Sequence, residues 1–295
     1  MASKATTNDE LLASSPPPSP PNAALSSPKE EETEEELPEE VITSIQTNLT
    51  SINDKIVTAL ASCSPPRSES SCSLVAVSKT HPAACIKAAY EAGQRLFGEN
   101  YVQELVSKSP TLPLDVRIHF IGPLQSNKVG NLIKGCKNLV CVETVASLKL
   151  AQKLHVAWGN SRVTTTKPES NNNDIFTPNQ LGIFLQIDTS GEETKSGLAY
   201  NDVTPIFELI EKIESDLTNL HFQGVMTIGA PGDMTCFAKL KSLADEISDK
   251  LGREVDVSMG MSGDFEAAIL EGATFVRVGS SIFGKRDYIG SKAST

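Results

Sequence analysis

The chain has 295 residues, of which 39% are hydrophobic and 21% charged, and its net charge of −11 disfavours general nucleic-acid binding, which needs Lys and Arg to neutralise phosphates. No apolar run approaches the length that crosses a bilayer, and the six cysteines form no CxxC pair. We therefore expect no integral membrane segment, reduced thiols and a cytoplasmic location.

The first forty residues differ in composition from the rest. They hold ten acidic residues against Lys4 and Lys29, and seven of the seventeen prolines. Such a segment buries too little apolar surface to offset its chain entropy, so we predict that residues 1–40 form a disordered acidic tail. A Ser-rich transit peptide is the alternative, but the first 28 residues contain no Arg and do contain Asp9 and Glu10, which speaks against it.

Regular apolar spacing begins at about residue 41. Apolar residues then recur every three or four positions as far as residue 60, which predicts an amphipathic helix. Beyond a Ser/Pro-rich break, short apolar runs alternate with helical patterns. Strands are predicted at residues 74–78, 95–100, 117–122, 139–144, 183–188, 222–228, 255–259 and 274–280. Helices are predicted at residues 82–92, 146–158, 201–214, 237–251 and 262–270, with Pro82 in a first turn and Ser262 as an N-cap.

Eight short apolar strands, most of them followed by a helix, predict an α/β protein with a parallel sheet. Eight is also the number that closes a (β/α)8 TIM barrel of roughly 250 residues, and we place this single barrel at residues 41–290. An open doubly wound sheet is the rival, but no G-x-G-x-x-G follows the first strand, which disfavours its dinucleotide-binding form. Residues 159–180 are polar and aperiodic, and we interpret them as an insertion rather than a functional loop.

Two basic residues occupy notable strand positions. Barrel enzymes place their chemistry at the carboxyl ends of the strands, and Lys79 directly follows the first predicted strand. Taken alone, Lys79 is either a surface lysine or a partly desolvated amine that can form a Schiff base. Arg277 lies within the last apolar strand, where a period of two puts it on the same face as Phe275. A buried guanidinium is costly without a partner or a ligand, so we expect Arg277 to have one.

Small residues follow the last two strands. Gly279 and Ser280 come at the end of the eighth strand, and Ser262 and Gly263 follow the seventh at a helix start. The loops after strands seven and eight of such barrels commonly bind phosphate, and the backbone N–H groups of a helix start suit an anion. Together with Lys79, these residues indicate a pocket for a ligand that carries a phosphate and an aldehyde.

Other polar residues at strand ends leave two interpretations open. Glu99 and Asn100 end the second strand and His119 lies in the third, and each suits either the barrel mouth or an ordinary turn or surface. The four histidines are far apart, and neither H-E-x-x-H nor G-x-S-x-G occurs. The sequence therefore disfavours a zinc site and a serine nucleophile elbow.

Seven segments occur in a distinctive order. They are V-A-V-S-K-T at 75–80, F-G-E-N-Y-V-Q-E at 97–104, H-F-I-G-P-L-Q-S-N-K at 119–128, T-S-G-E-E-T-K-S-G at 189–197, G-V-M-T-I-G at 224–229, S-M-G-M-S-G-D-F at 258–265 and V-R-V-G-S-S-I-F-G at 276–284. Over about residues 41–288, the chain thereby resembles the pyridoxal phosphate homeostasis proteins, also called the proline synthetase co-transcribed family.

The resemblance implies a barrel similar to the N-terminal domain of alanine racemase, with pyridoxal 5′-phosphate (PLP) at its mouth. By this resemblance Lys79 carries PLP as an internal Schiff base. The other residues that the resemblance places around PLP are Arg277 at the pyridine nitrogen, Ser262, Gly263, Gly279 and Ser280 at the phosphate, and Asn100 and Met226 beside the ring.

A charged Arg277 at the pyridine nitrogen disfavours the protonated ring that a strong electron sink requires. A racemase with such an arginine needs a second acid/base group, which in alanine racemase comes from a C-terminal β domain that we expect this chain to lack. The resemblance thus implies a PLP carrier in vitamin B6 homeostasis that delivers the cofactor to apo-enzymes, as a monomer or weak dimer, without robust catalysis. The alternatives are an amino-acid racemase, a Schiff-base phosphosugar aldolase and an interaction module that uses the acidic tail.

Overall fold

The computed structural model describes residues 37–162, 180–191, 196–230 and 232–284. Most of the predicted acidic tail and residues 163–179 of the predicted insertion lie outside the described residues. The first residues of that insertion, 159–162, form the last turn of a helix.

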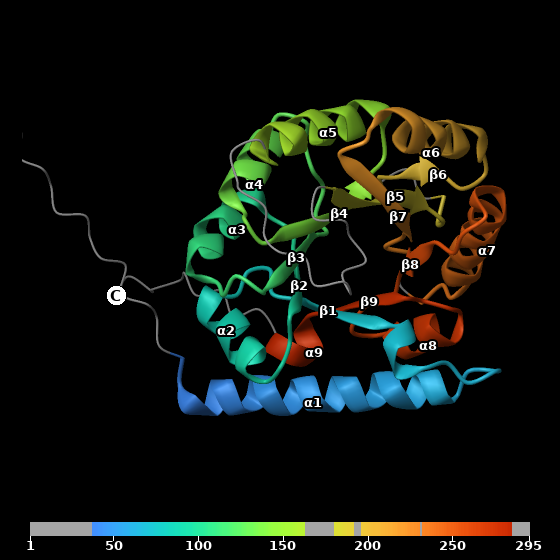
Figure 1. The fold of residues 1–295 in the computed structure, drawn as a ribbon. Helices are drawn as coiled ribbons and strands as arrows, with labels where there is room; N and C mark the ends of the chain where they lie inside the picture. Colours follow the sequence, from blue (N-terminus) through green and yellow to red (C-terminus); the bar gives the residue numbers. More distant parts are fainter. Residues whose placement is uncertain (1–36, 163–179, 192–195, 231, 285–295) are drawn as a thin grey trace, which may run out of the picture. The chain divides into compact units, whose positions relative to one another are not determined.

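Eight parallel strands close into a barrel with helices around it (Figure 1). Each strand pairs with its sequence neighbours in the ring, and the β1–β9 pairing closes it. The eight strands are β1 Ser73–Val77, β2 Leu96–Glu99, β3 Arg117–Phe120, β4 Leu139–Val145, β5 Leu181–Asp188, β7 Leu220–Met226, β8 Asp256–Ser258 and β9 Phe275–Val278. The predicted TIM barrel and its eight strands are confirmed, because parallel strands covered on both faces are read reliably as short apolar runs. A further strand of two residues, β6 Leu198–Ala199, pairs only with β5 and was not predicted.

The helices lie on the outside of the ring (Figure 1). They are α1 Glu39–Ala61, α2 Ala83–Glu91, α3 Val102–Lys108, α4 Val129–Gly135, α5 Leu148–Arg162, α6 Thr204–Asp216, α7 Thr235–Leu251, α8 Phe265–Leu270 and α9 Ser280–Phe283, with short 3₁₀ turns η1 Glu69–Ser71 and η2 Ser109–Thr111. No helix among these described residues is long and apolar enough to span a membrane.

Helix α1 begins with Glu39 and Glu40, whose carboxylates suit the positive end of the helix dipole. Its apolar stripe is buried against α2, α8 and α9, along the lower edge of the view in Figure 1. Nδ2 of Asn48 donates to the carbonyl of Ile282 at 3.1 Å, which ties α1 to α9. The apolar residues whose regular spacing begins at residue 41 therefore pack α1 against helices on the outside of the barrel.

The prediction that Ser262 caps a helix is wrong. Helix α8 begins at Phe265, and Asp264 is its N-cap. Oδ1 of Asp264 accepts the N–H of Met261 at 2.6 Å, and this bond closes a turn over residues 261–264 before the helix starts. The hydroxyl of Ser262 therefore does not cap the helix, and it accepts a hydrogen bond from Gly279 at the barrel mouth instead.

Five side chains form an apolar cluster inside the barrel. They come from β1, β4, β5, β7 and β9 and are Val75, Cys141, Phe184, Met226 and Phe275. The rings of Phe184 and Phe275 meet edge to face, with centroids 5.7 Å apart. Phe275 therefore faces the interior, and the predicted alternation along the last strand is confirmed for this residue.

We expect the native fold to protect all thiols except that of Cys63, which is half-buried, whereas the other five cysteines are buried. Burial raises the pKa of Cys72 to about 12 and that of Cys136 to about 11, so both stay protonated and unreactive near pH 8. A disulfide reagent should label one thiol in the native protein and six in urea, and none in native Cys63→Ser. Rapid native labelling of Cys72 or Cys136 would contradict this burial.

Candidate functional site

A cavity of about 290 Å³ opens at the carboxyl ends of β1, β8 and β9. Six of the eight predicted site residues line it: Lys79, Ser262, Gly263, Arg277, Gly279 and Ser280. The remaining described wall consists of Val77, His81, Ile121, Met261 and Gly284. The fold thus brings together residues that are up to about two hundred positions apart, as the strand-end rule predicts.

Lys79 reaches this cavity because of the alternation along β1. Val75 packs in the interior cluster and Val77 lines the cavity, whereas Ser78 hydrogen-bonds to Glu99 behind the strand. Continuing the period of two puts Lys79 on the inner side, and it too lines the cavity. The prediction of an amine at the barrel mouth therefore agrees with its placement.

A second part of the wall is formed by the turns after β8 and β9. The N–H of Gly279 donates to Oγ of Ser262 at 3.2 Å, so the two turns are joined. A Cβ on Gly279 would lie 3.1 Å from the carbonyl oxygen of Val77, which shows how closely the turn approaches β1. Among the described residues, the backbone N–H groups of Ser262 and Ser280 donate to no other group. Unsatisfied N–H groups from two turns suit an anion such as phosphate.

Among the described residues, the side chain of Asp264 makes no hydrogen bond in the cavity, so it does not compete there with an anion. Its carboxylate is held by the N–H of Met261, and Asp264 is not part of the described cavity wall. The carboxylate therefore serves the turn itself.

Arg277 is buried and bound from inside the barrel. Nη1 donates to Oγ of Ser258 at 2.6 Å and Nη2 donates to the carbonyl of Thr227 at 2.7 Å. Oε2 of Glu143 lies 3.8 Å from Nη1 and accepts the Ser258 hydroxyl at 2.6 Å. The prediction that this guanidinium needs a partner is confirmed, and Glu143 is that partner.

Glu143 also binds His119, whose Nδ1 lies 2.6 Å from Oε1. Burial by itself would raise the pKa of Glu143, but the His119 hydrogen bond and the charge of Arg277 outweigh it, and the pKa falls below its usual value. Because an ionised carboxylate only accepts, Nδ1 of His119 carries the proton of this bond. His119 is thus a buried member of the network and not a surface residue.

Burial lowers the pKa of Arg277, against the opposing effect of Glu143. An arginine begins from so high a pKa that it stays charged at neutral pH. Arg277 in the cavity wall and Glu143 inside the barrel therefore compensate each other's charge.

Two predicted residues lie outside the described cavity wall. Met226 is buried in the apolar interior cluster at the end of β7. Asn100 follows β2, and its Oδ1 is buried without a hydrogen-bond partner among the described residues. Met226 is the last residue of β7 and Asn100 directly follows β2, but a strand-end position does not by itself put a side chain into the cavity.

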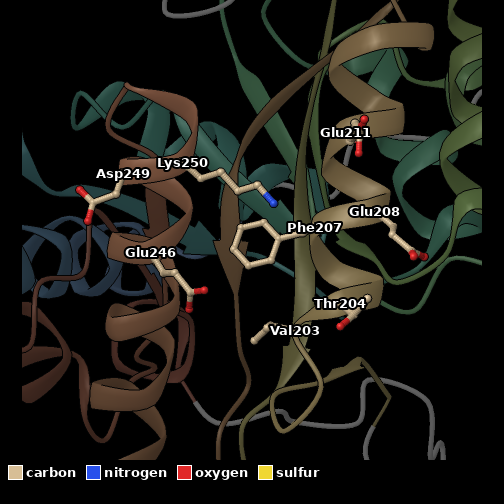
Figure 2. Close-up of a pocket in the computed structure, with 8 residues that line it drawn as sticks. All are labelled: Val203, Thr204, Phe207, Glu208, Glu211, Glu246, Asp249 and Lys250. Carbon is tan, nitrogen blue, oxygen red and sulfur yellow. The ribbon is translucent and has the colours of Figure 1, made fainter.

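Two larger hollows lie elsewhere. One of about 660 Å³ is formed by α6 and α7, where Figure 2 shows the ammonium of Lys250 beside the ring of Phe207, 4.1 Å from its centroid. Four carboxylates line it, from Glu208, Glu211, Glu246 and Asp249, and their charge would repel a phosphate. Another of about 1200 Å³ is lined by residues of α4 and α5, on the outside of the barrel. Neither holds any of the predicted site residues, so the strand-end cavity is the candidate site.

Comparison with known proteins identifies the class of this barrel. Residues 58–287 match the family model described as alanine racemase, N-terminal domain. Alanine racemase from Clostridium difficile, in complex with cycloserine, superimposes with a TM-score of 0.59 at 15% identity, over 85% of this chain and 61% of that one, which supports the fold.

The relatives that are similar in sequence point to a more specific family within this class. The human pyridoxal phosphate homeostasis protein is 42% identical over 73% of this chain and 77% of its own length. The Caenorhabditis elegans protein of the same name is 39% identical over 84% and 98%. The structure of PipY from Synechococcus elongatus with PLP bound aligns with a TM-score of 0.62 at 31% identity, over 81% of this chain and all of that one. The chain belongs to the family of pyridoxal phosphate homeostasis proteins.

Proposed function

We propose that this protein binds PLP covalently through Lys79 and acts in PLP homeostasis by sequestering the cofactor and delivering it to apo-enzymes. One observation carries the proposal. Lys79, Arg277 and the N–H groups of Ser262 and Ser280, which donate to no other described group, meet in one cavity. The human and worm relatives are named for PLP homeostasis, and PipY has been solved with PLP bound. An amine on one wall and an anion-binding turn on another suit a ligand with an aldehyde and a phosphate.

We assign the residues of the cavity to different parts of PLP. When bound, PLP supplies an aldehyde that reacts reversibly with lysine amines. Ser262 and Ser280 offer hydroxyls and backbone N–H groups to the phosphate, and Gly263 and Gly279 keep the turns free of side chains. Arg277 is proposed to face the pyridine nitrogen. We assign Asn100 and Met226 to the ring surroundings. The Oδ1 of Asn100, which is buried with no hydrogen-bond partner among the described residues, supports the assignment of Asn100.

The chemistry of the cavity favours a carrier over an enzyme. Arg277 keeps its charge through Ser258 and Glu143, and a fixed cation disfavours a protonated ring nitrogen. No tyrosine or carboxylate occurs among the described residues that line the cavity, which leaves Lys79 and His81 as its proton-transfer groups. We therefore propose a cytoplasmic protein without robust turnover, whose partners are PLP and apo-enzymes, and which works as a monomer or weak dimer.

We expect Lys79→Ala to abolish covalent attachment of PLP. The purified protein, mixed with PLP and reduced with borohydride, should turn yellow before reduction and carry the label on Lys79. The variant should retain under about a tenth of that label, because no other lysine is among the described residues of the cavity wall. Peptide mass mapping measures both results.

Lys212→Ala is the matched control, since Lys212 is an exposed lysine on α6 that pairs only with Asp216 among the described residues. It should keep full labelling. A label on a lysine other than Lys79 in the wild-type protein would refute the proposed site. Transfer of PLP to an apo-enzyme without amino-acid turnover supports the carrier, whereas racemisation that is lost in Lys79→Ala supports the enzyme.

A further inference from the structure

A buried lysine lies behind the cavity and contacts the backbone next to Lys79. Lys108 is the last residue of α3, and its side chain is only 7% exposed. Its Nζ donates to the carbonyl of Ser78 at 3.1 Å, to Oε1 of Glu99 at 2.9 Å and to Oε1 of Glu104 at 2.5 Å. The ammonium thus binds directly to the residue that precedes Lys79.

The residue that follows Lys79 is tied to the same ammonium. Oε1 of Glu104 accepts the N–H of Thr80 at 2.5 Å while it also accepts from Lys108. On the other side, the hydroxyl of Ser78 donates to Oε1 of Glu99 at 2.7 Å. The ion-paired group Lys108, Glu99 and Glu104, which we call the clamp, therefore holds both neighbours of Lys79.

Thr80 is the one non-glycine residue with a positive φ among the described residues, at 64°. A β-branched side chain is strained in this left-handed region, and such strain persists only where the surrounding structure enforces it. The hydrogen bond from Thr80 to Glu104 supplies that enforcement. The turn bends the chain immediately after Lys79.

Stability alone gives a poor account of the clamp. Buried ion pairs contribute little compared with apolar side chains of the same size, because both charges lose their water. Glu99 is fully buried, and its Oε2 has no hydrogen-bond partner among the described residues. The contacts of Lys108 are instead directed at the segment around Lys79.

We propose that the clamp is a positioning device, in which Lys108 and Glu104 hold residues 78–80 so that the Lys79 amine faces the cavity. This inference rests on the proposed function of Lys79. Lys108 is not among the described residues that line the cavity, and it acts through the strained turn.

The test compares Lys108→Met with Lys212→Met, a lysine that also pairs with a carboxylate four residues away but on the exposed face of α6. We expect Lys108→Met to attach PLP about tenfold more slowly and about tenfold more weakly, by absorbance titration and borohydride labelling. Amide hydrogen exchange at Thr80 in the PLP-free protein should accelerate at the same time, since its partner Glu104 is released. Lys212→Met should match the wild-type protein in all three measurements.

A rescue variant distinguishes positioning from general stability. Asparagine tolerates the left-handed region better than threonine, so Thr80→Asn in the Lys108→Met background should recover at least about threefold of the lost rate. Thr80→Asn in the wild-type background measures the effect of this substitution alone, including loss of the hydrogen bond from the Thr80 hydroxyl to the carbonyl of Lys79 at 2.6 Å, and the rescue is counted relative to it. The proposal would be overturned if Lys108→Met lowered the thermal stability but attached PLP at the wild-type rate. It would also be overturned if attachment slowed but Thr80→Asn did not restore it.

Glu104→Ala covers the case in which Lys108→Met does not fold. It leaves Lys108 paired with Glu99 and frees only the Thr80 N–H, and the Glu104 side chain is already 21% exposed. Slower attachment and faster exchange at Thr80 support the clamp, and wild-type values overturn it. If the wild-type protein attaches no PLP at Lys79, the proposed function fails and the clamp with it. If the wild-type protein does and these variants do so equally, the clamp alone fails.

Discussion

Glu143→Gln is expected to lower the free energy of unfolding by about 3 kcal/mol at pH 7, because it leaves a buried guanidinium without its counter-charge. Arg277 would keep Ser258 and Thr227 as neutral acceptors only. Urea denaturation followed by circular dichroism measures the loss. We also expect weaker PLP binding, since Arg277 would no longer be held rigidly in the cavity wall.

The direction of the pKa shift of Glu143 determines how the effect of this substitution on the unfolding free energy depends on pH. Its pKa in the folded protein lies below the ordinary value of 4.5, so its ionised form stabilises the fold fully above that pH. This contribution is lost as the pH falls through the folded pKa, where wild-type Glu143 becomes protonated and resembles glutamine. The difference in unfolding free energy between the two proteins should therefore shrink below pH 4.5.

Glu211→Gln is the matched control, because Glu211 is an exposed carboxylate on α6 (Figure 2). It should change the unfolding free energy by under about 0.5 kcal/mol. Equal stability of Glu143→Gln and the wild-type protein at pH 7 would mean that the Arg277–Glu143 pair contributes nothing to the fold.

The sequence predicts most of this barrel because its strands are apolar on both faces. The interior strands read as unbroken apolar runs, and the helices between them carry their own period. The helix cap after β8 was misplaced because Ser262 and Asp264 are both good N-caps two positions apart, and only the turn over residues 261–264 selects Asp264. Strand β6 is two residues long, too short for any period to register.

The residues of the site likewise include some that local sequence predicts and some that it does not. The strand-end rule and the alternation of the last strand were enough to place Lys79 and Arg277, since both depend on local sequence. Glu143 was missed, although it is a charged residue inside an apolar strand, which is the signal that identified Arg277. Its partners are 24, 115 and 134 positions away, so only the closed barrel shows that they meet. The clamp was missed for the same reason, because Lys108 and Glu104 look like an ordinary helical pair.

Gly224→Ala is expected to lower the free energy of unfolding by about 4 kcal/mol, the range of exceptional single substitutions. A Cβ at this position would lie 1.9 Å from the carbonyl oxygen of Asp256, and backbone cannot move aside as a side chain can. The clash falls on the β7–β8 pairing, where Gly224 is in register with Asp256 and Met226 with Ser258. Thermal unfolding of the PLP-free protein measures the loss.

Gly130→Ala provides the comparison, since Gly130 lies in α4 and nothing lies within 4 Å of its added Cβ. This variant should match or exceed the wild-type stability, because alanine is the better helix former by up to about 1 kcal/mol. A Gly224→Ala protein as stable as the wild type would refute the register of β7 against β8. Any Gly224→Ala protein that still folds should also bind PLP more weakly, because a displaced β8 carries Ser258 away from Arg277.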